Sequence, residues 1–392
     1  MADLSLRPAA RGAVALGLAV TGLLAGTAWV GEWPVAHARP VTIGVYQELP
    51  FGVARSHPSV TDGGRSSRDG RSTARLPVRE PSVRYRVEVG ARHVTAPIAL
   101  TNNTLLAVAA DHAGYVSLDG ALTPDGASLR GASGVSLSPE GFVVAETDGL
   151  AFLDSRLQVR ARVPVAGLSD AAPLVFADGT AVVSAGASLL RVDAAGTRRF
   201  TVPVASRAHS PVARTPSGRI VTATTTELLL LDQDGRVERR EPLGDHPVAG
   251  PAVGLDGSIW VMTAGGLAAF DADGAPRVRV PSPTSGPLTH GGLAIATDGS
   301  VRAAVLGFGV LALNASAAPL WSFALPQARF VVVDAAGGSL VATQDGLLVA
   351  LDADGQERWR VRLDGTPHAA PVLGVDGTVY VGLEGGSLVA LH

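Results

Sequence analysis

The chain has 392 residues, of which 46% are hydrophobic and 17% charged, and it contains 47 glycines and 26 prolines. Such a composition is typical of many short strands joined by tight turns. All basic residues are arginines and the net charge is −3, so the basic surplus of a general nucleic-acid binder is missing. The absence of cysteine excludes disulfides, thiolate chemistry and a lipid-anchored cysteine.

Residues 1–38 have the pattern of a targeting segment. Arg7 and Arg11 precede an uncharged apolar run over residues 12–30, and Ala-His-Ala at residues 36–38 is a small-x-small cleavage site. The run has 19 residues, close to the ~20 that span a bilayer. We therefore expect an exported, periplasmic or cell-surface protein, in which residues 1–38 are either a cleaved signal peptide or an uncleaved membrane anchor.

Residues 39–81 are rich in Arg, Ser, Gly and Pro, as in TDGGRSSRDGRSTARLP at residues 61–77. Few large apolar side chains are present to offset the entropy of ordering, so the composition predicts a flexible linker. VTIGVY at residues 41–46 is the one stretch there that resembles a strand.

The remaining residues, 82–392, are periodic. A turn of the Asp-Gly type recurs every 38 to 42 residues, and a leucine-rich strand that usually ends in Asp keeps the same spacing. Eight copies of about 39 residues fill this region, each with four short strands, as APVLGV, TVYVGL and SLVAL show for the last copy. This period predicts an all-β, eight-bladed propeller of four-stranded antiparallel blades.

The last copy stops after its third strand. SVRYRVEV at residues 82–89 is the only unpaired copy of the fourth strand, and it precedes the first inner strand. We expect it to complete the eighth blade, because an open ring would leave two exposed sheet edges.

The pattern APVLGVDGTVYVG, SLVALD and ADGxxxW resembles the PQQ-like repeat of eight-bladed propellers. That superfamily includes quinoprotein alcohol dehydrogenases and the outer-membrane assembly lipoprotein propeller. The repeat's Trp occurs only at Trp321 and Trp359. The dehydrogenases resembled here carry a vicinal disulfide, which a cysteine-free chain lacks, so PQQ is not expected as a cofactor. The DxDG runs are interpreted as hairpin turns, because they lack the further acidic ligands of a calcium loop.

Seven polar side chains occupy one equivalent loop of different repeats, nine to eleven residues before the turn, where the chain passes from an outer strand to the next inner strand. These loops should line one mouth of the central channel. His93, His290, Arg329 and His368 form a hypothetical site for an anionic group such as a carboxylate of an acidic sugar. Asp170, His209 and His246 form a hypothetical site for a divalent metal such as zinc. The alternative is that these residues are simply solvated loop positions.

The main functional hypothesis is an exported, non-catalytic scaffold that binds an envelope protein or a surface glycan, as a monomer and without a required cofactor. No nucleophile motif, phosphate-binding loop or HExxH helix is present. The alternative is a metal-dependent propeller enzyme or acidic-sugar binder that uses the His-lined mouth. The fold pattern itself does not choose between them, because the repeat encodes blade packing.

Overall fold

A computed structural model describes residues 66–392, except residues 101–103, 124–125, 206–209, 286–287 and 289–290. All of these residues belong to one compact unit, Pro40–His392. The expectations for residues 1–38 and the strand at residues 41–46 lie outside the described residues. Over the described ranges, no helix has the length and hydropathy needed to cross a bilayer.

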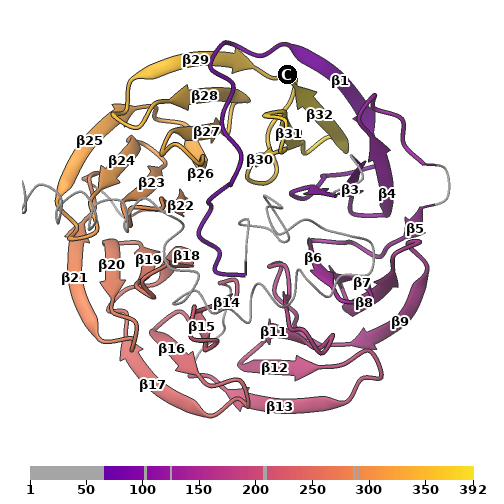
Figure 1. The fold of residues 1–392 in the computed structure, drawn as a ribbon. Coiled ribbons are helices and arrows are strands. Elements are labelled where there is room, and N and C mark those ends of the chain that lie inside the picture. Colours follow the sequence, from indigo (N-terminus) through magenta and orange to yellow (C-terminus); the bar gives the residue numbers. More distant parts are fainter. Residues whose placement is uncertain (1–65, 101–103, 124–125, 206–209, 286–287, 289–290) are drawn as a thin grey trace, which may run out of the picture. The chain divides into compact units, whose positions relative to one another are not determined.

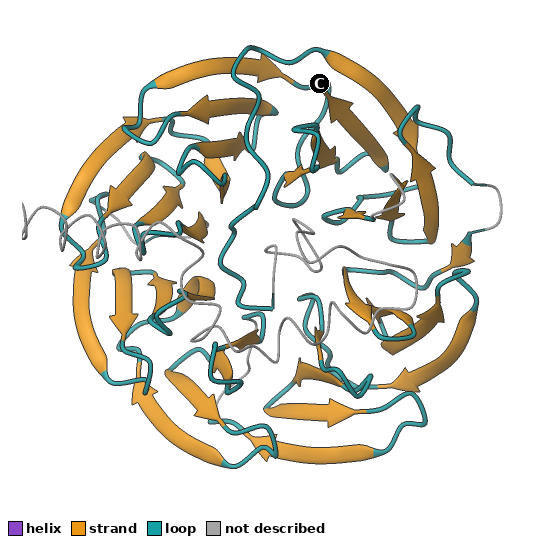
Figure 2. Ribbon diagram, viewed as in Figure 1, coloured by secondary structure: helices purple, strands orange, loops and turns teal. Residues whose placement is uncertain are grey.

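Eight four-stranded antiparallel sheets are arranged as blades around a central channel, which confirms the predicted propeller (Figures 1 and 2). In each blade the first strand is innermost and the fourth is outermost. Blades 1 to 4 comprise β2(Ile98–Ala99), β3(Thr104–Val108), β4(His112–Ser117), β5(Ala127–Ser128); β6(Gly134–Ser138), β7(Gly141–Glu146), β8(Gly149–Asp154), β9(Val159–Pro164); β10(Leu174–Val175), β11(Ala181–Ala185), β12(Ser188–Val192), β13(Arg198–Pro203); and β14(Ala213–Arg214), β15(Ile220–Ala223), β16(Glu227–Leu231), β17(Val237–Pro242).

Blades 5 to 8 continue the series. They comprise β18(Pro247–Val253), β19(Ile259–Thr263), β20(Gly266–Phe270), β21(Pro276–Pro281); β22(Gly291–Ile295), β23(Val301–Val305), β24(Gly309–Leu313), β25(Pro319–Ala324); β26(Ala328–Val333), β27(Ser339–Thr343), β28(Leu347–Leu351), β29(Glu357–Arg362); and β30(Val372–Leu373), β31(Val379–Gly382), β32(Ser387–Leu391) with β1(Val83–Glu88).

The second and third strands are almost entirely buried because each blade packs between two neighbours. In β19 and β20, for example, every residue is buried, and this explains why these strands read as continuous apolar runs. The Asp-Gly turns join the first two strands of a blade. At one of them Gly257 has a φ of +85°, which favours glycine, and Asp256 accepts a hydrogen bond from the Ser258 backbone N–H at 3.0 Å.

The eighth blade contains strands from both ends of the described chain. β1 pairs antiparallel with β32, with Arg86 opposite Val389 and Glu88 opposite Ser387. The Ser82 N–H also donates to the His392 carbonyl at 3.1 Å. The outer strand of blade 8 is thus supplied by residues that precede blade 1.

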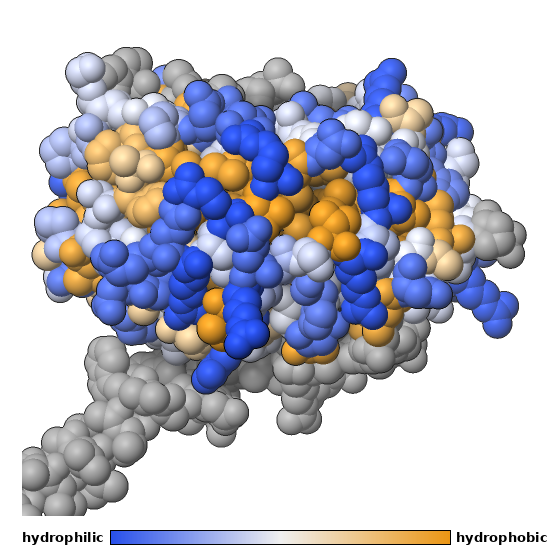
Figure 3. Space-filling view, turned by 90° about the horizontal axis from the view of Figure 1, so that it is seen from above, coloured by the Kyte–Doolittle hydropathy of each residue, from blue (hydrophilic) through white to orange (hydrophobic). Residues whose placement is uncertain are grey.

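Arginine side chains link the outer strands of neighbouring blades. Each donates from its own outer strand to a main-chain carbonyl at the end of the preceding outer strand: Arg162 to Ser128 at 2.8 Å, Arg240 to Pro203 at 3.2 Å, Arg279 to Pro242 at 3.1 Å, and Arg86 to Asp364 at 2.8 Å. Seen from the side of β1 and β29, hydrophilic side chains cover a band of hydrophobic ones (Figure 3). The guanidinium group suits these links between outer strands because it presents several hydrogen-bond donors in a fixed plane.

Candidate functional site: the central channel

Residues 66–77, here called the channel segment, lie along the inner strands of several blades (Figure 1, indigo). The contacts are main-chain hydrogen bonds with the last residues of β14, β18, β22 and β26: Arg214 N to Ser66 O at 2.8 Å, Val253 N to Ser67 O at 2.9 Å, Ile295 N to Asp69 O at 2.7 Å, Val333 N to Gly70 O at 2.9 Å, and Ser72 N to Val333 O at 2.8 Å. The segment therefore connects blades 4, 5, 6 and 7 across the channel.

This arrangement differs from the linker predicted over residues 39–81, of which the structure describes 66–81. The reason is that small side chains let the main chain approach the inner strands closely. Gly70 has a φ of +60°, and a Cβ there would lie 2.8 Å from Ala294 Cβ and 2.9 Å from Leu293 O. Over residues 66–72, hydrogen bonds rather than large apolar side chains hold the segment in the channel.

The charged side chains of the channel segment are paired with groups inside the ring. Arg71 Nη2 lies 3.1 Å from Asp69 Oδ2, and both side chains are buried. Arg68 is also buried and donates to two carbonyls, Ala172 O at 2.5 Å and Val212 O at 3.3 Å. Arg68 thereby extends the contacts of the segment to the residues just before the inner strands of blades 3 and 4.

The segment leaves the channel over blades 7 and 8. Leu76 donates its N–H to Asp334 Oδ2 at 2.9 Å, and Pro77 O accepts a hydrogen bond from Trp359 Nε1 at 2.7 Å. Ala74 and Leu76 join a buried apolar cluster formed by these two blades. Asp334 lies at the end of the inner strand β26, on the side of the Asp-Gly turns, which we call the turn side.

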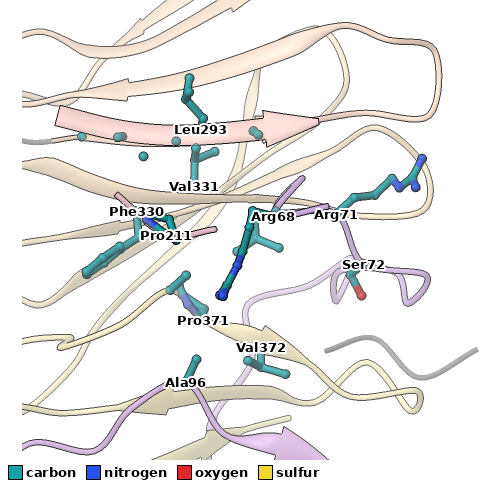
Figure 4. Close-up of a pocket in the computed structure, with 18 of the residues that line it drawn as sticks. Arg68, Arg71, Ser72, Ala96, Pro211, Leu293, Phe330, Val331, Pro371 and Val372 are labelled. Atoms are coloured by element: carbon teal, nitrogen blue, oxygen red, sulfur yellow. The ribbon is translucent and has the colours of Figure 1, made fainter. Parts of the chain in front are cut away.

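The opposite end of the ring, the loop side, carries the loops that lead from one blade to the next. A cavity of about 230 Å³ lies between the channel segment and the loop side. It is lined by inner-strand residues that include Ala249, Gly292 and Val331 and, from the channel segment, by Arg68, Gly70, Arg71 and Ser72. Figure 4 shows the Arg68 side chain extending toward Pro371, while Arg71 points away from it. The cavity is thus closed at the turn side by the chain's own residues.

On the loop side, the structure brings together three of the four residues of the predicted anion site. The rings of His93 and His368 stack with their centroids 4.0 Å apart. His93 Nε2 is 2.9 Å from Ala132 O, and Arg329 Nη1 pairs with Glu384 Oε1 at 3.5 Å. Burial, together with the proximity of His93 and Arg329, lowers the pKa of His368 to about 4. His290, the fourth residue, lies outside the described residues.

The predicted metal site is only partly described. Asp170 is exposed in the loop before β10, and His246 is exposed beside Asp245, with His246 Nδ1 and Asp245 Oδ1 at 3.4 Å. His209 lies outside the described residues. Among the residues that the structure describes, no three His, Asp or Glu side chains are grouped closely enough to hold a metal ion. The trio therefore stays a prediction.

Sequence reasoning missed Arg68, Asp69 and Arg71 as residues of the channel. Their neighbours are Ser and Gly, which are typical of both flexible linkers and close main-chain approach. One signal was present in the sequence, since the segment directly precedes the strand that closes the ring. Because β1 lies at the rim of the propeller, the residues just before it must also run close to the propeller.

Comparison by sequence identifies the repeat at the C-terminal end of the chain. Residues 306–392 match a family model described as outer membrane protein assembly factor BamB. This stretch covers the end of blade 6, all of blade 7 and β30, β31 and β32 of blade 8, and it contains Trp321 and Trp359. No curated protein sequence matches the chain. The resemblance to PQQ-like repeats is thereby confirmed.

Comparison by structure extends the likeness to the whole ring. BamB from Moraxella catarrhalis has a TM-score of 0.63 at 16% identity, covering 80% of this chain and 98% of that one. The computationally designed Ika8 protein has a TM-score of 0.65 at 14% identity, covering 78% and 98%. Virginiamycin B lyase from Staphylococcus aureus has a TM-score of 0.53 at 14% identity, covering 80% and 99%. At these identities the likeness concerns the fold.

Proposed function

We propose that this propeller with PQQ-like repeats is an exported scaffold of the cell envelope that binds other proteins without catalysis. The observation that carries the proposal is the channel segment. It occupies the turn side of the channel and leaves a cavity of about 230 Å³, below the roughly 300–1,000 Å³ typical of small-molecule sites. We therefore assign the binding of a partner protein to the outer surfaces of the ring.

Two further observations support a protein partner. The family model matched by residues 306–392 is described as an assembly factor for outer membrane proteins. On the turn side near blade 8, Val78 and Val375 are 80% and 67% exposed, and both line a groove beside the channel segment. Exposed apolar side chains of this kind are typical of protein contact surfaces when they are grouped.

The test is site-specific photo-crosslinking of the full chain in its own cells. A photoreactive residue replaces Val375 on the turn side, Asp170 on the loop side, or Arg358 on the rim. We expect one discrete crosslinked protein from one of the two faces, identified by mass spectrometry, and none from the rim position. Absence of a discrete crosslinked protein from both faces would contradict the proposal.

An anionic ligand at the loop side is the second candidate, because His93, His368 and Arg329 lie close to one another there. Titration calorimetry with glucuronate, and with uncharged glucose as the control, tests this candidate. Binding of glucuronate alone, lost on Arg329→Ala, would favour it over the scaffold. Equal heats for both sugars would reject it.

A further inference from the structure

The outer strand of blade 6, β25, differs from the other six-residue outer strands of the ring. β1, β9, β13, β17, β21 and β29 each carry at least two charged residues, whereas β25, with the sequence PLWSFA, carries none. Its exposed positions are Pro319, Leu320, Ser322 and Ala324, and Leu320 is 51% exposed. The last three of these alternate along the strand. The corresponding positions of β29 are Arg358, Arg360 and Arg362.

The sixth position of these strands also differs. It is proline in β9, β13, β17 and β21, charged in β1 and β29, and alanine in β25. The next residue donates its N–H inward to the residue that precedes the third strand, as Val165 does to Asp148 O at 3.0 Å and Leu325 to Phe308 O at 3.3 Å. Because N–H directions alternate along a strand, the sixth residue's N–H points outward.

Proline at the sixth position therefore removes an outward-facing donor from the rim. Natural sheets protect their edges against added strands with proline and with charged side chains. Among the outer strands that the structure describes, β25 is the six-residue strand that has no charged residue and no proline at its sixth position, although Pro319 begins it. Its edge keeps the Ala324 N–H and presents no charge to an incoming strand.

We propose that β25 pairs antiparallel with β25 of a second copy of this chain. The choice of a second copy as the partner rests on the charges that two identical outer strands would bring together. A two-fold axis at the fourth position of a strand brings that residue against its own copy, which is Arg against Arg in β1, β9, β17, β21 and β29. The pair is uncharged in β13, Thr201 against Thr201, and in β25, Ser322 against Ser322, and of these two strands only β13 has proline at the sixth position. Like charges directly opposite destabilise a pair of strands. The same axis places each Leu320 opposite Ala324 of the other copy, a large residue against a small one.

This pairing is isologous, so it closes as a two-fold dimer and does not propagate. It goes beyond the proposed function and replaces the sequence-based expectation of a monomer. It can be tested on the purified full chain whether or not a scaffold partner exists.

The experiment uses the absence of cysteine from the chain. In Ser322→Cys, a two-fold pair would bring the two sulfur-bearing residues to a Cα separation of about 5.5 Å, within the range that a disulfide bridges. Thr201→Cys, at the same position of β13, is the matched control. We expect a disulfide-linked dimer from the Ser322→Cys chain, at least about tenfold more abundant than from the control, on mild oxidation of the purified full chain.

A second substitution, Ala324→Pro in the Ser322→Cys chain, gives β25 the proline found in four other blades. We expect it to lower the dimer yield about tenfold, since each copy loses an outward donor, while the melting temperature stays unchanged. Equal dimer yields from Ser322→Cys and Thr201→Cys, or a yield insensitive to Ala324→Pro, would overturn the proposal. Crosslinking of Ser322→Cys to a different protein in cells, without self-linking, would overturn the choice of occupant.

Discussion

The Asp334 carboxylate accepts a hydrogen bond from the Leu76 N–H at 2.9 Å, although 258 residues separate the two in the chain. The same carboxylate accepts from the N–H groups of Ala336 at 2.9 Å and Gly338 at 2.7 Å. One buried side chain thus holds both the turn of blade 7 and the end of the channel segment. The contact joins the segment that closes the channel to the ring that surrounds it.

Asp334→Ala should destabilise the protein by about 2–4 kcal/mol, because three N–H groups, two of them in buried hydrogen bonds, lose a charged acceptor. Thermal unfolding measures the effect, and trypsin cleavage at the exposed Arg75 and Arg79 reports release of the segment. The control is Asp298→Ala in an exposed turn of blade 6, which accepts from Ser300 only within its own turn. If both variants were cleaved at the same rate, the role assigned to Asp334 would be wrong.

Trp359→Phe should loosen the channel segment, since it removes the hydrogen bond from Trp359 Nε1 to Pro77 O and keeps an aromatic ring. We expect a loss of about 1 kcal/mol and faster trypsin cleavage at Arg79. Trp321→Phe is the matched control, because Trp321 Nε1 donates instead to Ala353 O at 2.8 Å within the ring. That variant should lose similar stability without faster cleavage at Arg79. Cleavage accelerated equally in both would contradict the prediction.

Deletion of residues 82–89 should unfold or aggregate the protein, because it would expose the edge of β32 that β1 now covers. Size-exclusion chromatography and the melting temperature measure this outcome. Arg86→Ala serves as a milder comparison, since it removes only side-chain hydrogen bonds, to Ser387, Asp364 and Glu88. A monomeric deletion variant with an unchanged melting temperature would show that the ring does not need this strand.

Acidification should destabilise the loop side through His368. Burial, with His93 and Arg329 nearby, lowers its pKa to about 4 from 6.5. The unfolded chain therefore takes up a proton before the folded chain does, and the free energy of unfolding falls as pH drops from about 6.5 to about 4. Because His368 is partly exposed, we expect a loss of about 1–2 kcal/mol across this window.

The measurement for His368 is the melting temperature between pH 8 and pH 4. His368→Gln should flatten the decline in that range, whereas His246→Gln, at an exposed loop position, should leave it as in the parent protein. An identical pH dependence in all three proteins would indicate that other groups control the acid response.

The sequence by itself determined the number of blades and the order of strands within them. The Asp-Gly turns, such as Asp376-Gly377, and the apolar runs beside them are local signals, because hairpin geometry and strand burial depend on residues a few positions apart. The same repeat period predicted that His93, Arg329 and His368 lie at one mouth of the channel. Their spacing along the chain indicates that they occupy equivalent loops of different repeats.

Only the tertiary structure decided the path of residues 66–77 and the contact between the rings of His93 and His368. Arg68 and Asp69 are buried against main-chain carbonyl and N–H groups that come into place only when the ring is closed. Arg68, for example, donates to the carbonyl of Val212, which lies 144 residues away in the chain. No local pattern of side chains encodes such main-chain contacts, since a Ser- and Gly-rich stretch is equally suited to solvent and to a narrow channel. The ring therefore had to be formed before the place of this segment was defined.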